Sequence, residues 1–302
     1  MENADLGISK KSKEICSLSM VRRVAAMLDL DVNTFAEGDL LPKGWHFFML
    51  AGETKKSDLR ADGFPGLGVP IPELTGSASR LPRLLLGGRT VIYQGGILIG
   101  SVVEKTSFVK NITEKTTASG RMAIVTIQHE LQSITDEKPA IVETQTYIFK
   151  ELGNNQLGIR NGQLEIKNEE LGIRNQELES GNVGSKIPNS KLLIPNSFTP
   201  DETLLFQYSA LGFNSHKIHL DRNYAQNVEG LPDLVVNGGL TTLLITEFVR
   251  KELNLSISEI KVKHLAPLFC NRPFTISFEQ NEIKIYNDRN ELAVLCQLEV
   301  FN

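Results

Sequence analysis

The chain has 302 residues, 41% of them hydrophobic and 23% charged, which is enough to bury a full core and favours two domains of ordinary size. A formal net charge of -4 and scattered lysines and arginines argue against nucleic acid and anionic membranes as partners. Three cysteines are too few, and of the wrong parity, for a disulfide framework, so reduced, buried thiols are expected.

The first half reads as one helix followed by short strands. Residues 17–30 place apolar side chains near one face, with Ser17 and Ser19 as candidate caps, and predict a helix. A Gly- and Pro-rich crossing follows at residues 63–72, and irregular segments of that length are usually functional. Strands are then predicted at 90–93, 96–103, 122–129 and 140–149, and together they indicate an antiparallel sheet.

A seven-residue repeat separates the two halves, running from Gln156 to about Ser180. Its apolar residues lie two positions apart, as in Leu157 and Ile159, whereas a coiled-coil seam needs spacings of three and four. The richness in Asn, Gly and Glu favours a tandem duplication in a flexible linker. A short interaction helix is the alternative.

The second half repeats the plan of the first. Residues 204–210 alternate in polarity and predict a strand, and residues 240–253 predict a long helix that is apolar around much of its circumference. A helix of that kind is expected to be wrapped by a sheet. Further strands are predicted at 257–265, 274–279, 283–286 and 292–301.

A polar corner follows the predicted strand at 204–210. It holds Asn214, His216, His219 and Asp221, and a glycine turn comes soon after, in the run Asn237-Gly238-Gly239-Leu240. Packing alone gives little reason for these residue types to cluster. Chemistry explains the cluster more simply, so we expect an active site here.

The spacing from Asn214 to His219, with Ile218 before the histidine and Asp221 after it, resembles the hydratase motif of MaoC-like enzymes. The wording around it is closer to the double-hot-dog branch that contains type 2 hydroxyacyl-thioester dehydratases and mesaconyl-CoA hydratases. The resemblance implies an α+β double hot-dog fold, with two antiparallel curved sheets each wrapped round a long central helix. It divides the chain into an N-terminal acyl- or carrier-binding hot-dog domain (1–150), a linker (151–197) and a C-terminal catalytic hot-dog domain (198–302).

The resemblance also assigns chemical roles. His219 matches the catalytic histidine, and imidazole suits proton transfer because its ordinary pKa lies near neutrality. Asn214 stands where other members carry an aspartate, so orientation of water or of an intermediate is its expected role. His216 is the first candidate to compensate for the missing carboxylate, and Asp221 the second.

The start of the predicted central helix would supply donors for the charge that develops on a thioester oxygen. The backbone N–H of Gly238 is the matching position. Asn237 replaces a usual histidine and Gly239 a frequent proline or methionine, which leaves the entry to the helix looser than in the family. We group Gly238, Gly239, Asn237 and Asp221 as expected oxyanion- or substrate-binding residues.

Several of these residues have structural alternatives. Asn214 and Asp221 fit a turn and an N-cap as well as they fit a site. Packing is the preferred interpretation for Tyr208, Tyr224 and Phe213, with the lining of an acyl pocket as the alternative, and for Trp45, with substrate contact as the alternative. His46, His129 and His264 lack ligand spacing and are interpreted as structural. For Arg80, Arg83 and Arg89, carrier binding is weighed against ordinary surface charge.

The predicted activity is that of a hydro-lyase, adding water to a trans-2-enoyl thioester or removing it from an (R)-3-hydroxyacyl thioester, with a mesaconyl-CoA-type hydratase as a narrower version. The alternatives are a hot-dog thioesterase and a catalytically weak acyl-binding protein. CoA or acyl carrier protein is the expected partner, and no cofactor or metal is required because the thioester itself acidifies the α-carbon. A homodimer is left open. The polar N-terminus and the absence of a long apolar run predict a cytoplasmic protein without a membrane span.

Overall fold

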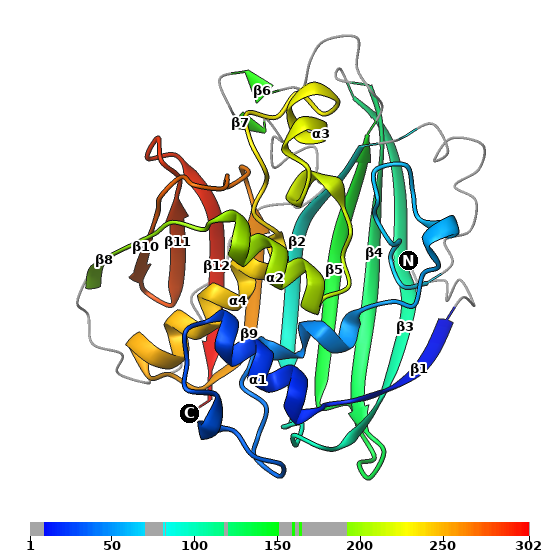
Figure 1. The fold of residues 1–302 in the computed structure, drawn as a ribbon, viewed down its shortest axis with the longest axis vertical. Helices are drawn as coiled ribbons and strands as arrows, with labels where there is room; N and C mark the ends of the chain where they lie inside the picture. The colour runs from blue at the N-terminus through cyan, green and yellow to red at the C-terminus, as the bar shows by residue number, and fades with distance from the viewer. Residues whose placement is uncertain are drawn as a thin grey trace.

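The computed structural model describes residues 9–69, 81, 83–117, 120–150, 159–160, 163–164 and 192–301. Ten strands form one antiparallel sheet in the order β1-β3-β4-β5-β2-β9-β12-β11-β10-β8 (Figure 1). In that order they are Ser9–Ile15, Val102–Thr117, Gly120–Ser133, Ile141–Lys150, Arg83–Tyr93, Ile257–His264, Leu292–Val300, Glu282–Tyr286, Phe274–Glu279 and Leu192–Phe198.

The two halves of the chain meet at the centre of this sheet. Strand β2 of the first half pairs with β9 of the second over five residue pairs, from Gly88 opposite Lys263 to Ile92 opposite Glu259. The double hot-dog class predicted from the sequence is confirmed, with the two expected sheets joined edge to edge into one.

The helices α1 (Leu18–Met27), α2 (Glu202–Leu211) and α4 (Gly238–Phe248) lie on the same face of the sheet (Figure 1). Helix α3 (Arg222–Asn227) lies above α2 in the same view, and α4 continues as one π-helical turn, Val249–Leu253. The 3-10 turns are η1 (Val32–Thr34), η2 (Trp45–Leu50), η3 (Lys56–Asp58) and η5 (Lys217–His219).

Helix α4 is the central helix of the second half. From Leu240 to Phe248 every residue is buried, as expected of a helix that is apolar around much of its circumference. The corresponding element of the first half is much shorter than a long central helix. It is the turn η2, whose Trp45 indole donates to Glu247 on α4 at 2.8 Å and whose C-terminal carbonyls accept from the buried Lys105 amine on β3.

Other elements differ from the sequence prediction. Residues 204–210, predicted as a strand, form most of α2. Asp201 accepts from the backbone N–H of Leu204 as N-cap, and the buried residues Leu205, Tyr208 and Ser209 follow the helical spacing. The predicted strand 96–103 is also wrong for most of its length, since β3 begins at Val102. Strands β1 and β8 were not anticipated, and β8 lies inside the segment expected to be linker.

Most of the repeat between the halves lies outside the described residues, so the linker and interaction-helix interpretations both remain predictions. The described part is a small pairing of β6 (Ile159–Arg160) with β7 (Gln163–Leu164). Among the helices of the described chain, none has the length and apolar character needed to cross a membrane.

Candidate active site

A cavity of about 200 Å³ lies between the two halves of the fold, and we call it the central cavity. The first half contributes β2 and β5 side chains and Phe64, and the second contributes the 214–219 loop, the start of α4 and the end of β9. Six of the seven residues selected from the sequence line it: Asn214, His216, His219, Asn237, Gly238 and Gly239. Segments far apart in the sequence therefore meet at one enclosed space.

His219 is held in a defined tautomer. It lies at the end of turn η5, is 8% exposed, and donates from Nδ1 to the Val235 carbonyl oxygen at 2.7 Å. A carbonyl oxygen only accepts, so Nδ1 carries the proton and Nε2 keeps its lone pair in the neutral ring. Burial lowers the pKa of His219 to about 3, and His216 adds to the effect. The ring therefore enters any reaction neutral, with Nε2 free to accept a proton.

His216 packs beside this ring. The two imidazoles meet edge to face with centroids 5.4 Å apart, and Phe64 contacts the other side of His216. Burial lowers the pKa of His216 to about 4, with a contribution from Arg60. Its Nε2 lies 3.7 Å from Oδ2 of Asp62, beyond hydrogen-bond distance, so His216 is a neutral neighbour that fixes the position of His219.

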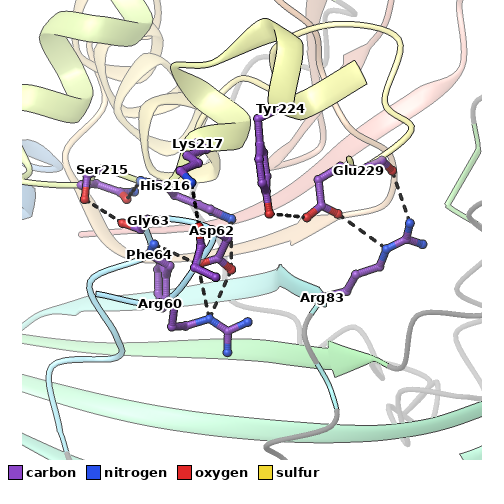
Figure 2. A network of polar contacts seen from close by, with 12 residues as sticks. Arg60, Asp62, Gly63, Phe64, Arg83, Ser215, His216, Lys217, Tyr224 and Glu229 are labelled. Atoms are coloured by element: carbon purple, nitrogen blue, oxygen red, sulfur yellow. Dashed lines mark hydrogen bonds and ion pairs between the residues drawn. The ribbon is translucent and has the colours of Figure 1, made fainter. Parts of the chain in front are cut away.

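A first-half segment, residues 60–64, holds the 214–219 loop in place (Figure 2). The Lys217 N–H donates to the Asp62 carbonyl at 2.8 Å, and the Ser215 hydroxyl donates to the Gly63 carbonyl at 2.6 Å. A Cβ on Gly63 would lie 2.3 Å from the Ser215 carbonyl oxygen, so only glycine allows this approach. The first half of the chain thus fixes the position of the 214–219 loop directly.

Asn214 and Asp221 differ in their positions. The Asn214 side-chain oxygen accepts from the His216 N–H at 3.1 Å, so the residue organises the turn while also lining the central cavity. Asp221 is exposed, accepts from the Tyr224 N–H at 2.9 Å as N-cap of α3, and does not line the cavity. The N-cap interpretation therefore describes Asp221, and its expected place among the substrate-binding residues does not match the structure.

Helix α4 begins at the cavity wall. Its first N–H groups have no intrahelical acceptor, and the Asn237 side chain does not cap them. Asn237 instead donates from Nδ2 to Ser209 on α2 at 3.2 Å, while its buried Oδ1 has no partner among the described residues. A Cβ on Gly238 would lie 2.7 Å from the Leu86 side chain, so glycine keeps this approach open. The helix start presents free donors to the cavity.

Three further side chains line this cavity that were not among the seven selected residues: His264, Arg89 and Tyr208. Arg89 was weighed only as a carrier-binding residue, and Tyr208 only as a packing residue with the acyl pocket as alternative. His264 at the end of β9 was interpreted as structural, yet its buried Nε2 is unpartnered within the described chain and lies 3.1 Å from the position of a Cβ on Gly238. Burial, with Arg89, lowers its pKa to about 4. Period-two spacing was a usable signal, because Ile260 and Val262 are inward-facing and His264 continues the series.

Trp45, Tyr224 and Arg83, which the sequence also singled out, make contacts that hold the fold together. Trp45 is fully buried in the core, as expected, and Tyr224 donates to Glu229. Arg83 lies 3.6 Å from the same carboxylate, joining the halves (Figure 2). Phe213 is exposed in a left-handed turn with φ of 46°, so packing does not explain it. Arg80 lies outside the described residues.

The central cavity combines the neutral imidazoles of His216, His219 and His264 with the charged guanidinium of Arg89, and no carboxylate is among the described side chains found to line it. Within the described ranges, no three His, Cys, Asp or Glu side chains gather in a way that could hold a metal ion. The arrangement suits proton transfer next to a polarised carbonyl.

The comparisons with known proteins agree with this chemistry. The profile of the hydroxyacyl-thioester dehydratase type 2 family matches residues 44–270. A mesaconyl-C(4)-CoA hydratase of Chloroflexus aurantiacus is 28% identical, over 94% of this chain and 92% of its own length. A mitochondrial hydroxyacyl-thioester dehydratase type 2 of Schizosaccharomyces pombe is 26% identical, over 80% of this chain and 78% of its own.

Solved structures support the fold. HtdX of Mycobacterium tuberculosis matches with a TM-score of 0.61 at 10% identity, over 97% of this chain and all of the other. Another protein of the same organism, described as having a double hotdog fold, matches with a TM-score of 0.57 at 11% identity, over 98% and 97% of the two chains. The profile covers well over half of the residues, and the chain belongs to the hydroxyacyl-thioester dehydratase type 2 family of hydro-lyases.

Proposed function

We propose that this protein reversibly hydrates a trans-2-enoyl thioester in the central cavity, with His219 as the proton-transfer group and the start of α4 as the oxyanion site. One observation carries the proposal: the free Nε2 side of a tautomer-fixed histidine and the uncapped N-terminus of a buried helix share one cavity. Proton transfer by His219 and stabilisation of the oxyanion by the start of α4 both require that the two groups face the same bound substrate.

The reaction follows from these two groups. Nε2 of His219 takes a proton from water while the water oxygen bonds to the β-carbon. The electron pair of the C=C bond moves toward the thioester carbonyl, where the Gly238 N–H stabilises the oxygen. The proton then passes from the imidazolium to the α-carbon, which restores neutral His219 and completes the addition of water. Dehydration is the same path in reverse.

The low pKa of His219 fits this path when the charge of the intermediate is included. Burial disfavours an isolated imidazolium. An enolate forming beside it supplies an opposite charge, which favours the protonated ring at the moment when it is needed. His264 is a second candidate donor to the thioester oxygen, because its unpartnered Nε2 lies next to Gly238.

Asn214 and His216 have supporting roles in this proposal. Asn214 accepts from the His216 N–H, so its amide orients the loop and presents a polar group to bound water. His216 supports the imidazole of His219 by ring packing. The first half would act as the wall that receives the acyl group, with the second half supplying the reacting groups.

A thioesterase is less well supported. That reaction would use a carboxylate near the central helix, and no Asp or Glu is among the described side chains lining the central cavity. Hydration and hydrolysis are separated by the product, since only hydrolysis releases a free thiol.

The test uses crotonyl-CoA, followed by the loss of its conjugated-enoyl absorbance, with a thiol assay in parallel. Wild type should remove the absorbance without releasing thiol. His219→Asn keeps a side-chain donor near the Val235 carbonyl but removes Nε2, and its kcat/KM should fall by about 10²–10⁴. Binding without turnover by wild type would support the acyl-binding alternative, and thiol release would support the thioesterase.

A further inference from the structure

Two adjacent glycines at the start of α4 leave room for side chains from other elements. Glycine is less favourable in a helix than alanine by up to about 1 kcal/mol, so each position needs a structural reason. A Cβ on Gly238 would lie 3.1 Å from Nε2 of His264, and a Cβ on Gly239 would lie 2.1 Å from the hydroxyl oxygen of Tyr208. Each glycine therefore lets a polar atom from another element approach the first turn of the helix.

Tyr208 reaches this turn from the buried side of α2. The residue is 6% exposed, and its ring stacks on that of Phe47, with centroids 4.5 Å apart and planes inclined by 22°. Helix and stack together fix the direction of the ring. Tyr208 and Gly239 both line the central cavity, so the hydroxyl lies at the cavity wall next to the proposed oxyanion site.

The Tyr208 hydroxyl is free to bind a ligand. No described residue forms a hydrogen bond with it. The other tyrosine lining the central cavity differs, because the Tyr147 hydroxyl donates to Gln145 at 2.5 Å. A buried polar group without a partner costs about 1–3 kcal/mol, and this cost is removed when a bound ligand supplies an acceptor.

The electrostatic surroundings make this hydroxyl a donor. Burial raises the pKa of Tyr208, and the opposing effect of Arg89 is smaller, so the phenol stays protonated at neutral pH. Nη2 of Arg89 lies 3.2 Å from the same Cβ position on Gly239 that the hydroxyl approaches. A cation beside a phenol favours loss of its proton and so strengthens the O–H as a donor.

We infer that Tyr208 is a catalytic residue whose hydroxyl donates a hydrogen bond to the thioester oxygen at the start of α4. The inference rests on the proposed function, which places that oxygen beside the Gly238 N–H. The bond strengthens as the oxygen gains negative charge in the enolate, because hydrogen bonds to ionised acceptors are the strong ones. It therefore stabilises the transition state more than the bound substrate. Gly239 is the residue that leaves space for the hydroxyl.

The variant Tyr208→Phe removes the hydroxyl and keeps the ring that stacks on Phe47. Its kcat for hydration of crotonyl-CoA should fall by about 10²–10³, the usual loss for one oxyanion donor. Tyr286→Phe is the matched control, because it removes a phenol hydroxyl from strand β11 that does not line the central cavity. Its kcat should equal that of wild type, and thermal unfolding checks that both variants are folded.

A spectroscopic measurement separates this role from a structural one. The probe is the ketone analogue of butyryl-CoA, in which a methylene replaces the thioester sulfur, labelled with carbon-13 at the carbonyl. Hydrogen bonds to a carbonyl oxygen draw electron density from its carbon, so the resonance of the analogue bound to wild type should lie downfield of the free analogue. Tyr208→Phe should move this resonance part of the way back and weaken binding by about 2- to 10-fold.

Gly239→Ala tests the same contact from the side of the helix. Its methyl group would lie 2.1 Å from the Tyr208 hydroxyl oxygen and must displace it, so kcat should fall as it does for Tyr208→Phe. In a protein that already carries Tyr208→Phe the hydroxyl is absent, and Gly239→Ala should add little to the loss. The effects of the two substitutions should therefore be far from additive.

A folded Tyr208→Phe protein that keeps either the kcat or the bound-carbonyl resonance of wild type would overturn the inference, as would additive losses with Gly239→Ala. Failure of the proposed function looks different. In that case wild type would not hydrate crotonyl-CoA, and the resonance alone would decide whether Tyr208 contacts the carbonyl.

Discussion

Mild acid should destabilise this protein strongly, because four of its five histidines are buried as neutral rings. The pKa of His129, His216 and His264 is lowered to about 4, and that of His219 to about 3, in each case chiefly by burial. In the unfolded chain each returns to about 6.5. Between pH 6.5 and the pKa values of the folded state, the unfolded state binds more protons than the folded state. The contribution of these neutral rings to stability is therefore complete above about pH 6.5 and is lost as the pH falls toward the folded pKa values.

The magnitude follows from the size of these shifts. A histidine with a folded pKa of about 4 and an unfolded pKa of about 6.5 lowers the free energy of unfolding at pH 5 by about 2 kcal/mol relative to neutral pH. Four such groups cost about 8 kcal/mol, which is comparable with the whole stability of a typical domain at about 5–15 kcal/mol. The slope near pH 5 should be about 5 kcal/mol per pH unit.

Urea unfolding at several pH values between 7 and 5 measures this slope from the free energies of unfolding. His129→Gln removes one titrating group and should reduce the slope by about 1.2 kcal/mol per pH unit. A stability that is flat across this range, or a slope that His129→Gln leaves unchanged, would refute the claim that these rings are buried in the neutral form.

Three further outcomes follow from the structure. Gly238→Ala should lower kcat for enoyl hydration by about 10²–10³ while the protein stays folded, because the added methyl meets Leu86 at the oxyanion donor, and a steady-state assay against wild type decides it. Gly63→Ala should lower both stability and kcat, since its Cβ would lie 2.3 Å from the Ser215 carbonyl at a φ of 78°, with Gly66→Ala as a glycine of similar φ and open surroundings for comparison. The cysteine thiols are buried, with the pKa raised to between about 11 and about 12, so a thiol reagent should react with them only after unfolding, and rapid labelling of the native protein would contradict this.

The elements that the sequence predicted best are those with one unambiguous periodicity. The helix at 17–30 and the buried helix at 240–253 were both found, as were the four strands predicted between residues 257 and 301. The segment that forms helix α2 was predicted as a strand, because its short alternation of polar and apolar residues fits the period of a strand as well as that of a helix. The deciding signals were Asp201 as N-cap and Glu202 in the first turn, which favour a helix.

The residues of the histidine motif line one cavity, as predicted, because local spacing was enough to place Asn214, His216 and His219 together. Arg89 and Glu143 were harder to place, since their meaning depends on pairing between β2 and β5. Each sits two residues from an inward apolar neighbour, Val91 and Ile141, so the inner-face alternation was present in the sequence. That these inward charges pair with one another, and that Arg89 lines the central cavity, follows only from the tertiary structure.

A crystal structure with the ketone analogue of butyryl-CoA tests the central claim most directly. The account predicts the analogue's carbonyl oxygen about 2.7–3.1 Å from the backbone nitrogen of Gly238, with its β-carbon facing Nε2 of His219. A carbonyl bound outside the central cavity, or one turned away from the start of α4, would contradict it.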